Sequence, residues 1–326
     1  MKIMVYEARP DERADLEKQA ALHGVELSVT DAVPTLENAS LAAGCIGVSI
    51  LGQGCIDAAL LDAYHALGIR YLSTRTIGYD HIDLDHARSI GLRVCSASYA
   101  PNGVADFTVM MILMCLRHYK QALWRGQVND FSLTGLQGRE MKDLTIGIIG
   151  TGRIGAQVAR NLSGFGCRIL AYDLRRNPAV EPQVTYVDFD TLLAQSDVIT
   201  LHMPLLDSNR HIINRESIAK MRDGVVIVNC SRGELADIEA LIEGIETGKI
   251  GALGMDTVEG DEGIIHADHR VDILPNRNWF YLHQFRNVIM TQHMAFYTDA
   301  AVSSMVDCGI GGICQMAAGE SCPTEL

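Results

Sequence analysis

Short apolar runs alternate with longer amphipathic stretches along most of the chain. The runs are rich in Val and Ile without polar alternation, which is typical of parallel strands covered on both faces. They span residues 3–6, 45–50, 71–73, 93–95, 145–149, 168–171, 198–201, 225–229, 253–255 and 288–290. Helical patterns lie between them, for example over 57–67, 154–163 and 238–247. This alternation predicts an α/β protein with doubly wound parallel sheets.

The strand–helix alternation occurs twice, before and after a long apolar stretch at 102–116. We therefore expect two domains, one made of residues 1–99 with 297–326 and a larger one made of residues 100–296. The most apolar part of this stretch, residues 107–116, is about half as long as a bilayer requires and predicts a buried helix at a domain or subunit interface.

Two other segments carry weaker patterns. The tail 298–318 looks helical and has no sheet of its own to cover, so we expect it to pack on the first domain. Residues 261–284 lack clear periodicity and predict a long, partly ordered loop.

The composition indicates which binding partners and which cellular compartment to expect. The 326 residues carry a formal charge of −13, which argues against nucleic acid and anionic membranes as partners. Nine widely spaced cysteines without a C-x-x-C pair predict a reducing cytoplasm, and the N-terminus turns acidic before a signal peptide can form. His266 and His269 form an H-x-x-H without a third ligand, so we expect no metal.

A glycine-rich motif gives the strongest chemical signal. The apolar run 146–149 leads into Gly150, Gly152 and Gly155, which fit G-x-G-x-x-G, and a helical pattern follows. Such a turn brings backbone N–H groups to a pyrophosphate. Asp173 ends the next strand about twenty residues on, where an acid binds ribose hydroxyls and repels a 2′-phosphate. The motif predicts NAD rather than NADP, although Arg175 and Arg176 partly offset that repulsion. The alternative is a tight turn without a ligand.

Two further strand ends carry polar side chains. Arg232 follows the run 225–229, where an arginine can bind a substrate carboxylate and polarise a carbonyl, or can simply lie at the surface. His293 follows the run 288–290, and it is either a structural residue or the group that passes a proton to an alcohol.

Together these residues give the chain an end-to-end resemblance to the NAD-dependent D-isomer-specific 2-hydroxyacid dehydrogenases, nearest to their D-lactate dehydrogenase branch. The resemblance is carried by the segments 74–83 and 99–102, the glycine-rich turn, the turn 231–233, and His293 followed by Tyr297 and Thr298. It implies a Rossmann dinucleotide-binding domain inserted into a flavodoxin-like substrate domain.

The resemblance also implies roles for the matching residues. Arg232 orients the substrate carboxylate and carbonyl, and His293 is the acid in reduction and the base in oxidation. The family places a Glu after the strand that carries Asp256 to pair with the catalytic His, and here that position holds Asp261. We prefer Asp261 as the partner of His293, with Glu262 as the alternative.

Binding contacts are implied for two further groups of residues. Those to the substrate are Leu51, Ile77, Gly78, Tyr99, Phe296 and Tyr297. Those to NAD are Gly150, Gly152, Arg153, Ile154, Gly155, Asp173, His202, Met203, Pro204, Cys230, Ser231 and Asp256.

The resulting functional prediction is reduction of a 2-keto acid to the D-2-hydroxy acid. Leu51 is apolar and provides no cation for a second carboxylate, so the pocket should accept a methyl, alkyl or aromatic side chain. Pyruvate to D-lactate is the first expectation, and phenylpyruvate to D-phenyllactate is the alternative. An NAD-sensing regulator on the same fold is the alternative of another class. The long apolar helix also predicts a homodimer.

Overall fold

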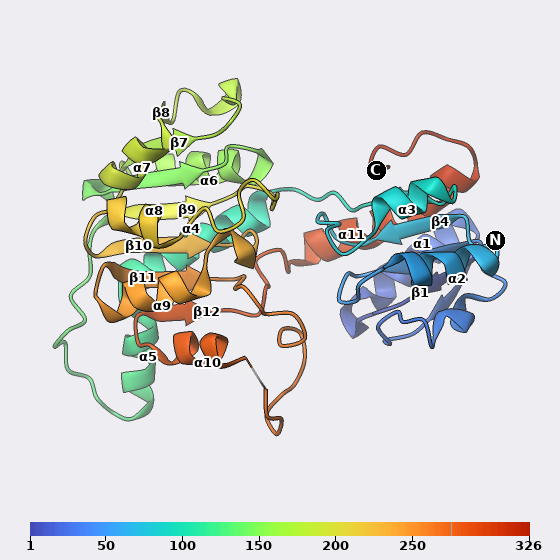
Figure 1. Cartoon of the computed structure of the whole chain (residues 1–326), viewed down its shortest axis with the longest axis horizontal. Coiled ribbons are helices and arrows are strands. Elements are labelled where there is room, and N and C mark those ends of the chain that lie inside the picture. The colour runs from blue at the N-terminus through green and yellow to red at the C-terminus, as the bar shows by residue number, and fades with distance from the viewer. Residues whose placement is uncertain (275) are drawn as a thin grey trace. The chain divides into compact units, whose positions relative to one another are not determined.

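The computed structural model of the chain describes residues 1–274 and 276–326. It contains two compact units, one formed by Met1–Ala100 with Tyr297–Leu326 and one formed by Pro101–Phe296. Each unit is built on one open sheet whose strands all run parallel, with helices packed on it (Figure 1). The predicted α/β class with two doubly wound parallel sheets is therefore confirmed.

The sheet of the first unit has five strands in the order 2-1-3-4-5, which is the flavodoxin-like order. Its strands are β2 (Glu26–Val29), β1 (Lys2–Val5), β3 (Gly47–Ile50), β4 (Tyr71–Thr74) and β5 (Arg93–Cys95). Its helices are α1 (Arg13–His23), α2 (Ala58–Ala66), α3 (Leu84–Ser89) and α11 (Asp299–Ala317), with short 3-10 turns at Pro10–Glu12 and Ala39–Ala42. The strand order reverses between β1 and β3, and such a point is where open α/β sheets bind ligands.

Helix α11 belongs to the core of this unit. Its side chains Val306, Ile310 and Ile313 are fully buried with Ile3 and Val5 of β1. A Cβ at Gly309 would lie 2.8 Å from the Arg75 side chain, so glycine permits the close approach. Among the described residues, α11 is the one helix that is long and apolar enough to cross a membrane by length and composition. Half of its apolar segment is buried inside the structure, however.

The sheet of the second unit has seven strands, which Figure 1 shows from β8 at the top to β12 at the bottom. Counted from the first strand of the unit, the order is 3-2-1-4-5-6-7, the Rossmann order with one added strand. The strands in spatial order are β8 (Thr185–Tyr186), β7 (Arg168–Tyr172), β6 (Thr145–Ile149), β9 (Val198–Leu201), β10 (Val225–Asn229), β11 (Ile250–Met255) and β12 (Val288–Met290).

Seven helices of the described chain belong to this unit. They are α4 (Asn102–Leu116), α5 (Tyr119–Gln127), α6 (Arg153–Ser163), α7 (Phe189–Gln195), α8 (Arg215–Lys220), α9 (Ile238–Glu246) and α10 (Arg277–Gln284), with 3-10 turns at Met141–Asp143, Pro178–Val180 and Gly233–Leu235. Helix α4 packs on α6 and on β10 and β11. Its apolar side chains are therefore largely covered by its own unit. Met111 and Ile112, for example, have no exposed surface.

Several elements were not predicted by range, and one segment differs from its prediction. The elements without a predicted range are the helices α1, α3, α5, α7 and α8 and the edge strands β2 and β8. Part of the segment 261–284, expected as a loop, is helix α10, which Asn276 caps by accepting a hydrogen bond from the Trp279 amide at 3.0 Å. Residue 275 of that segment lies outside the described residues.

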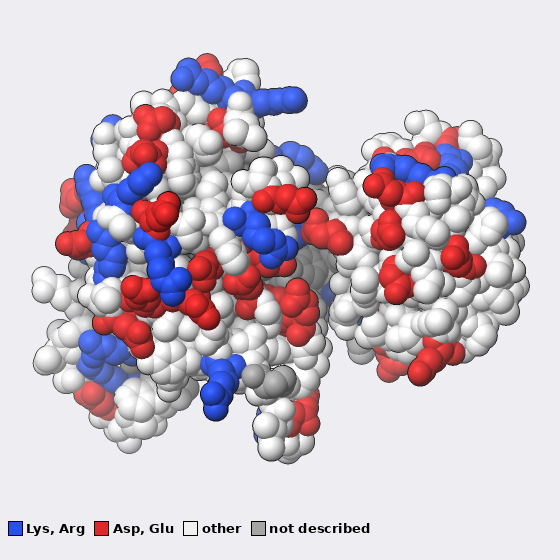
Figure 2. Space-filling model, viewed as in Figure 1, with Lys and Arg blue, Asp and Glu red and all other residues white. Residues whose placement is uncertain are grey.

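Charged side chains of both signs are interspersed on the face shown in Figure 2. Many form ion pairs at the surface, such as Lys220 with Asp190 at 2.8 Å and Arg215 with Glu243 at 2.7 Å. Exposed pairs of this kind contribute little to stability, so we assign them no role beyond solvation.

Candidate active site

The glycine-rich loop joins β6 to α6 at the point where the strand order of the second unit reverses. Gly150 has a φ of +93°, and a Cβ there would lie 2.7 Å from the carbonyl oxygen of His202, which follows β9. A Cβ at Gly155 would clash with the carbonyl oxygen of Gly150. A Cβ at Gly152, the N-cap of α6, would meet no described atom within 4 Å. The helix N-terminus thus has open space beside it, and this fits a pyrophosphate.

Asp173 follows β7 and is tied to the same loop. Its carboxylate accepts hydrogen bonds from the Thr151 amide at 2.6 Å and the Thr151 hydroxyl at 3.0 Å. Tyr186 donates its hydroxyl to Thr151 Oγ1 at 2.8 Å, and Asn177 donates Nδ2 to the Thr151 carbonyl at 2.8 Å. The Asp173 carboxylate also accepts a hydrogen bond from the Arg175 amide at 3.0 Å. A carboxylate has about four acceptor positions, so Asp173 can still bind one ribose hydroxyl. Sequence reasoning found Asp173 but missed Tyr186 and Asn177.

His202 is buried at the end of β9. Burial lowers the pKa of His202 to about 3, so the ring is neutral at pH 7. Its Nε2 lies 2.9 Å from Thr200 Oγ1, while its buried Nδ1 has no hydrogen-bond partner among the described residues. A buried polar atom without a partner is costly, and a bound ligand can supply one. This observation, together with the open space at Gly152, fits a dinucleotide lying across the strand ends.

The turn after β10 carries Arg232. Asn229 accepts a hydrogen bond from the Ser231 amide at 3.0 Å and donates one to the Arg232 carbonyl at 2.7 Å. Ser231 donates its hydroxyl to the Met203 carbonyl at 2.5 Å, which joins this turn to the segment after β9. A Cβ at Gly233 would clash with the backbone at Val258. These contacts fix the backbone from which the Arg232 side chain projects.

Cys230 lies in the same turn and is buried. Burial is the main cause that raises the pKa of the Cys230 thiol, with the Asp256 charge acting in the same direction. The thiol is therefore neutral and has no thiolate character for nucleophilic chemistry.

Asp256 and His293 follow the neighbouring strands β11 and β12. Asp256 is 1% exposed, and its carboxylate accepts hydrogen bonds from Thr291 Oγ1 at 2.6 Å and from the amides of Met294 and Ala295 at 2.9 and 2.8 Å. His293 lies between these partners with a φ of 53°, in the left-handed region that non-glycine residues rarely adopt. Such a backbone persists only where its surroundings fix it, and Asp256 does so here.

The surroundings of His293 lower its pKa to about 4. Burial is the largest cause, and the charges of Arg232 and His266 act in the same direction, whereas the Asp256 charge raises the pKa. His266 donates a hydrogen bond from Nε2 to the His293 carbonyl at 3.3 Å, and the two rings are 6.2 Å apart. The Phe296 ring lies 6.3 Å from that of His293. Sequence reasoning considered His266 only as a metal ligand, and no group of three metal-binding side chains occurs in the described part of the chain.

The acidic segment after β11 is ordered by its own backbone. Asp261 accepts a hydrogen bond from the Val258 amide at 3.1 Å, and burial raises the pKa of Asp261 to about 6. Glu259 forms an ion pair with His211 at 2.6 Å. The predicted pairing of His293 with Asp261 or Glu262 stays a prediction.

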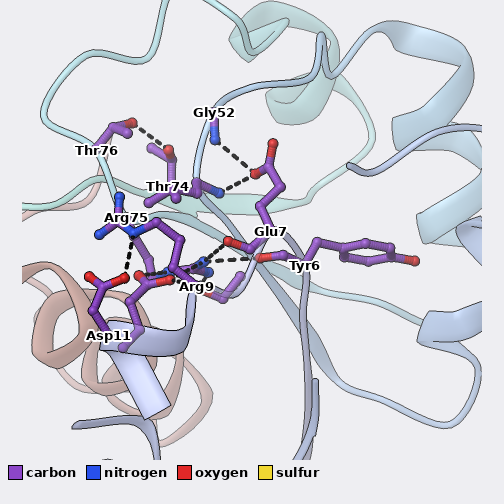
Figure 3. Close-up of polar contacts among 11 residues, drawn as sticks. Tyr6, Glu7, Arg9, Asp11, Gly52, Thr74, Arg75 and Thr76 are labelled. Atoms are coloured by element: carbon purple, nitrogen blue, oxygen red, sulfur yellow. Dashed lines mark hydrogen bonds and ion pairs between the residues drawn. The ribbon is translucent and has the colours of Figure 1, made fainter. Parts of the chain in front are cut away.

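The first unit places its predicted residues on loops that follow adjacent strands. Leu51 follows β3, and Ile77 and Gly78 follow β4. Thr76 donates its hydroxyl to the Gly78 carbonyl at 2.6 Å, and Thr74 lies 2.6 Å from Thr76 Oγ1 (Figure 3). The loop that carries Ile77 and Gly78 is thus held by its own hydroxyls.

Two more predicted residues also belong to this unit. Tyr99 follows β5, and Tyr297 has the Arg9 guanidinium 5.0 Å from its ring centre. Phe296 is the last residue of the second unit.

Comparisons with known proteins identify one family of relatives. Residues 109–295 match the family described as D-isomer specific 2-hydroxyacid dehydrogenase, NAD binding domain. An aromatic 2-oxoacid reductase from Clostridium sporogenes is 42% identical over 311 residues, covering 94% of this chain and 93% of that protein.

Solved structures give the same result. The apo-structure of D-lactate dehydrogenase from Escherichia coli has a TM-score of 0.88 at 36% identity and covers 100% of both chains. The NAD-complexed form of a D-isomer specific 2-hydroxyacid dehydrogenase from Lactobacillus delbrueckii ssp. bulgaricus has a TM-score of 0.84 at 30% identity, also over 100% of both chains.

Proposed function

Because the chain belongs to the D-isomer specific 2-hydroxyacid dehydrogenase family and is an NAD-binding oxidoreductase, we propose that it reduces a 2-oxo acid to the D-2-hydroxy acid with NADH. The observation that carries this proposal is the site in the second unit. There Asp256 fixes His293, the Arg232 charge acts on His293, and the glycine-rich loop follows β6 of the same sheet.

In this proposal the cofactor and two side chains each have one role in the reduction. Bound NADH supplies the hydride that reduces the carbonyl carbon. Arg232 binds the substrate carboxylate and stabilises the negative charge that grows on the carbonyl oxygen. His293 donates its proton to that oxygen, and in the reverse direction it accepts the proton of the hydroxyl group.

The lowered pKa of His293 bears on its role as an acid. With a pKa of about 4, the imidazole of the free protein is mostly neutral at pH 7. An anionic substrate beside it favours the charged form, as does a carboxylate such as Asp261 or Glu262. We therefore propose that His293 takes up a proton when the substrate binds. Asp261 is the preferred carboxylate partner that stabilises the charged imidazole.

We also propose a role for each domain and the binding contacts to substrate and NAD. Residues 100–296 form the NAD-binding domain, and residues 1–99 with 297–326 form the substrate domain. The amides of Ile77 and Gly78 bind the carboxylate, while Leu51, Tyr99, Phe296 and Tyr297 contact the remainder of the substrate. Gly150, Gly152, Arg153, Ile154 and Gly155 bind the pyrophosphate. The remaining cofactor contacts are Asp173, His202, Met203, Pro204, Cys230, Ser231 and Asp256.

For the substrate, we propose a 2-oxo acid with a large apolar or aromatic side chain, with pyruvate as the competing candidate. Leu51 offers an apolar contact, and the aromatic 2-oxoacid reductase has 42% identity against 36% for the Escherichia coli D-lactate dehydrogenase. This reverses the order that the sequence analysis preferred. The NAD-sensing alternative has no support from the relatives described above, which are enzymes.

We also propose a homodimer, on different grounds from those in the sequence. Helix α4 is covered by its own unit, whereas α5 and the segment after it expose Trp124, Phe131 and Leu133 by 64%, 78% and 83%. Apolar groups exposed along one segment mark an interaction surface. Light scattering should give twice the chain mass, and Phe131→Asp should reduce it to the mass of one chain.

A cytoplasmic setting is proposed because the nine cysteines are free thiols.

The test of this function is replacement of the proposed acid. His293→Ala should lower turnover of every 2-oxo acid by at least about a hundredfold, the usual contribution of a general acid. NADH affinity, measured by quenching of its fluorescence, should stay within about twofold. Near-normal turnover in this variant would refute the assignment of His293.

A further inference from the structure

A buried carboxylate holds the loop after β3 in the first unit. Glu7 lies just after β1, is 3% exposed, and has a φ of 55°. Its carboxylate accepts hydrogen bonds from three consecutive backbone amides, those of Leu51, Gly52 at 2.9 Å and Gln53 at 2.7 Å (Figure 3). One side chain thus binds all three amides of residues 51–53.

The position of this contact in the fold is informative. Glu7 follows β1 and the loop follows β3, the two strands between which the order of the first sheet reverses. In open α/β sheets the ligand crevice lies at such a point, beyond the carboxyl ends of the strands. Here the amides at that place are bound to an internal carboxylate, so the loop is fixed before any ligand arrives.

A second buried group fixes Glu7 itself. The Arg75 guanidinium donates to the carbonyls of Tyr6 at 3.0 Å and Glu7 at 3.3 Å. It also forms an ion pair with Glu12 at 2.9 Å, and neither side chain of that pair has any exposed surface. The left-handed backbone of Glu7 is therefore held by a charged network rather than by the preference of the residue.

The loop has little freedom to adopt another shape. Gly52 has a φ of +91°, and a Cβ there would lie 3.0 Å from the His81 ring. Loss of the Glu7 carboxylate would leave three buried or half-buried amides without their acceptor, and the loop would have to move to regain partners. Leu51 is the first residue of this loop and would move with it.

We infer that Glu7 is a positioning residue for substrate selectivity, which holds Leu51 against the substrate side chain through the amides of residues 51–53. The inference rests on the proposed function, because selectivity among 2-oxo acids exists only if the chain reduces them. Glu7 itself contacts neither substrate nor cofactor in this account. Its effect is confined to the place that Leu51 occupies.

The test compares two substrates in two variants. Glu7→Gln keeps the length of the side chain but replaces one acceptor oxygen by an NH2 group that faces an N–H. The ratio of kcat/KM for phenylpyruvate to that for pyruvate should fall about tenfold, since a pocket contact displaced by about 1 Å has effects of this size. The affinity for NADH should not change. Glu325→Gln is the matched control, because Glu325 binds Arg93 at 2.7 Å in the same unit and the ratio should stay at its wild-type value.

A double variant separates positioning from general damage. In a Leu51→Ala background, Glu7→Gln should no longer change the ratio, because the side chain through which it acts is absent. If Glu7→Gln does not fold, Glu7→Asp takes its place, since the shorter carboxylate keeps the charge but cannot reach all three amides. An unchanged ratio in a folded Glu7 variant overturns the inference, as does an equal fall of the ratio in the Leu51→Ala background. If the wild-type protein reduces no 2-oxo acid, the proposed function itself is refuted and the inference falls with it.

Discussion

Asp256 holds the turn that carries His293, because its carboxylate accepts hydrogen bonds from the amides of the two residues that follow the histidine, Met294 and Ala295. The same carboxylate supplies the nearby negative charge that raises the pKa of His293. One buried side chain therefore controls both the place and the proton affinity of the proposed acid. Its replacement should affect chemistry and stability together.

Replacement of Asp256 by Asn should lower kcat/KM for reduction at pH 7 by about 10- to 100-fold, because the turn loses an acceptor and His293 loses a favourable charge. The free energy of unfolding should fall by about 1–3 kcal/mol, the cost of leaving a buried amide without a partner. Urea unfolding and steady-state kinetics measure the two effects. Asp188→Asn makes the same change at the exposed start of α7, where Asp188 accepts from the Thr191 amide, and it should leave the kinetics unchanged. A kinetic loss as large in that control would contradict the role of Asp256.

The lowered pKa of His293 predicts the direction of the pH dependence. Reduction needs the protonated imidazole, and with a pKa of about 4 this form decreases as the pH rises. The value of kcat/KM for reduction should therefore fall by about tenfold per pH unit above about pH 5. A profile that is flat between pH 5 and pH 8 would show that another group donates the proton.

His266 should influence this profile from its place beside His293. Its charge lowers the pKa of His293, so His266→Phe should move the descending limb to higher pH. His269→Phe is the matched control, because His269 lies in the same segment and pairs with Asp272 at 2.8 Å. Equal profiles for the two variants would contradict an effect of His266 on the acid.

The partner of His293 can be identified by two parallel substitutions. If Asp261 pairs with His293 during catalysis, Asp261→Asn should remove its negative charge and weaken reduction at high pH by about tenfold or more. Glu262→Gln should then have little effect. The reverse result would assign the pairing to Glu262, and no effect in either variant would remove both from the mechanism.

Asp173 should decide the choice between the two nicotinamide cofactors. Its carboxylate lies at the end of β7, where it faces the ribose in the proposed complex and repels a 2′-phosphate. Asp173→Ser should raise the ratio of kcat/KM for NADPH to that for NADH by at least about tenfold. Arg175 and Arg176 remain to bind the added phosphate. An unchanged cofactor ratio would place the ribose elsewhere.

Much of the fold could be predicted because buried parallel strands have a clear sequence pattern. The runs that became β6, β9 and β10 are continuous apolar segments, and each strand lies where its run predicts. The edge strands β2 and β8 were missed because each has an exposed residue and too few apolar positions to stand out. Helix α10 was missed because it has only eight residues, too few to show a clear apolar period within the irregular segment 261–284, and because its start depends on the Asn276 cap.

Functional residues could be predicted only where they follow a strand that the sequence pattern reveals. Gly150, Asp173, Arg232 and His293 each lie within three residues of the end of a predicted strand, and the structure shows this placement for all four. Glu7 gave no such signal, because its importance comes from amides 44 to 46 residues away in the sequence. The surroundings of His293 likewise depend on His266, which approaches it from another segment of the chain.

The most direct test of the account is a panel of 2-oxo acids assayed by NADH oxidation, with chiral analysis of each product. The account predicts turnover with NADH, preference for a large apolar or aromatic side chain over the methyl group of pyruvate, and only the D-hydroxy acid as product. Tight NADH binding without turnover of any 2-oxo acid would contradict the proposed function. An L-hydroxy acid as product would contradict the proposed arrangement of His293 and Arg232 around the substrate.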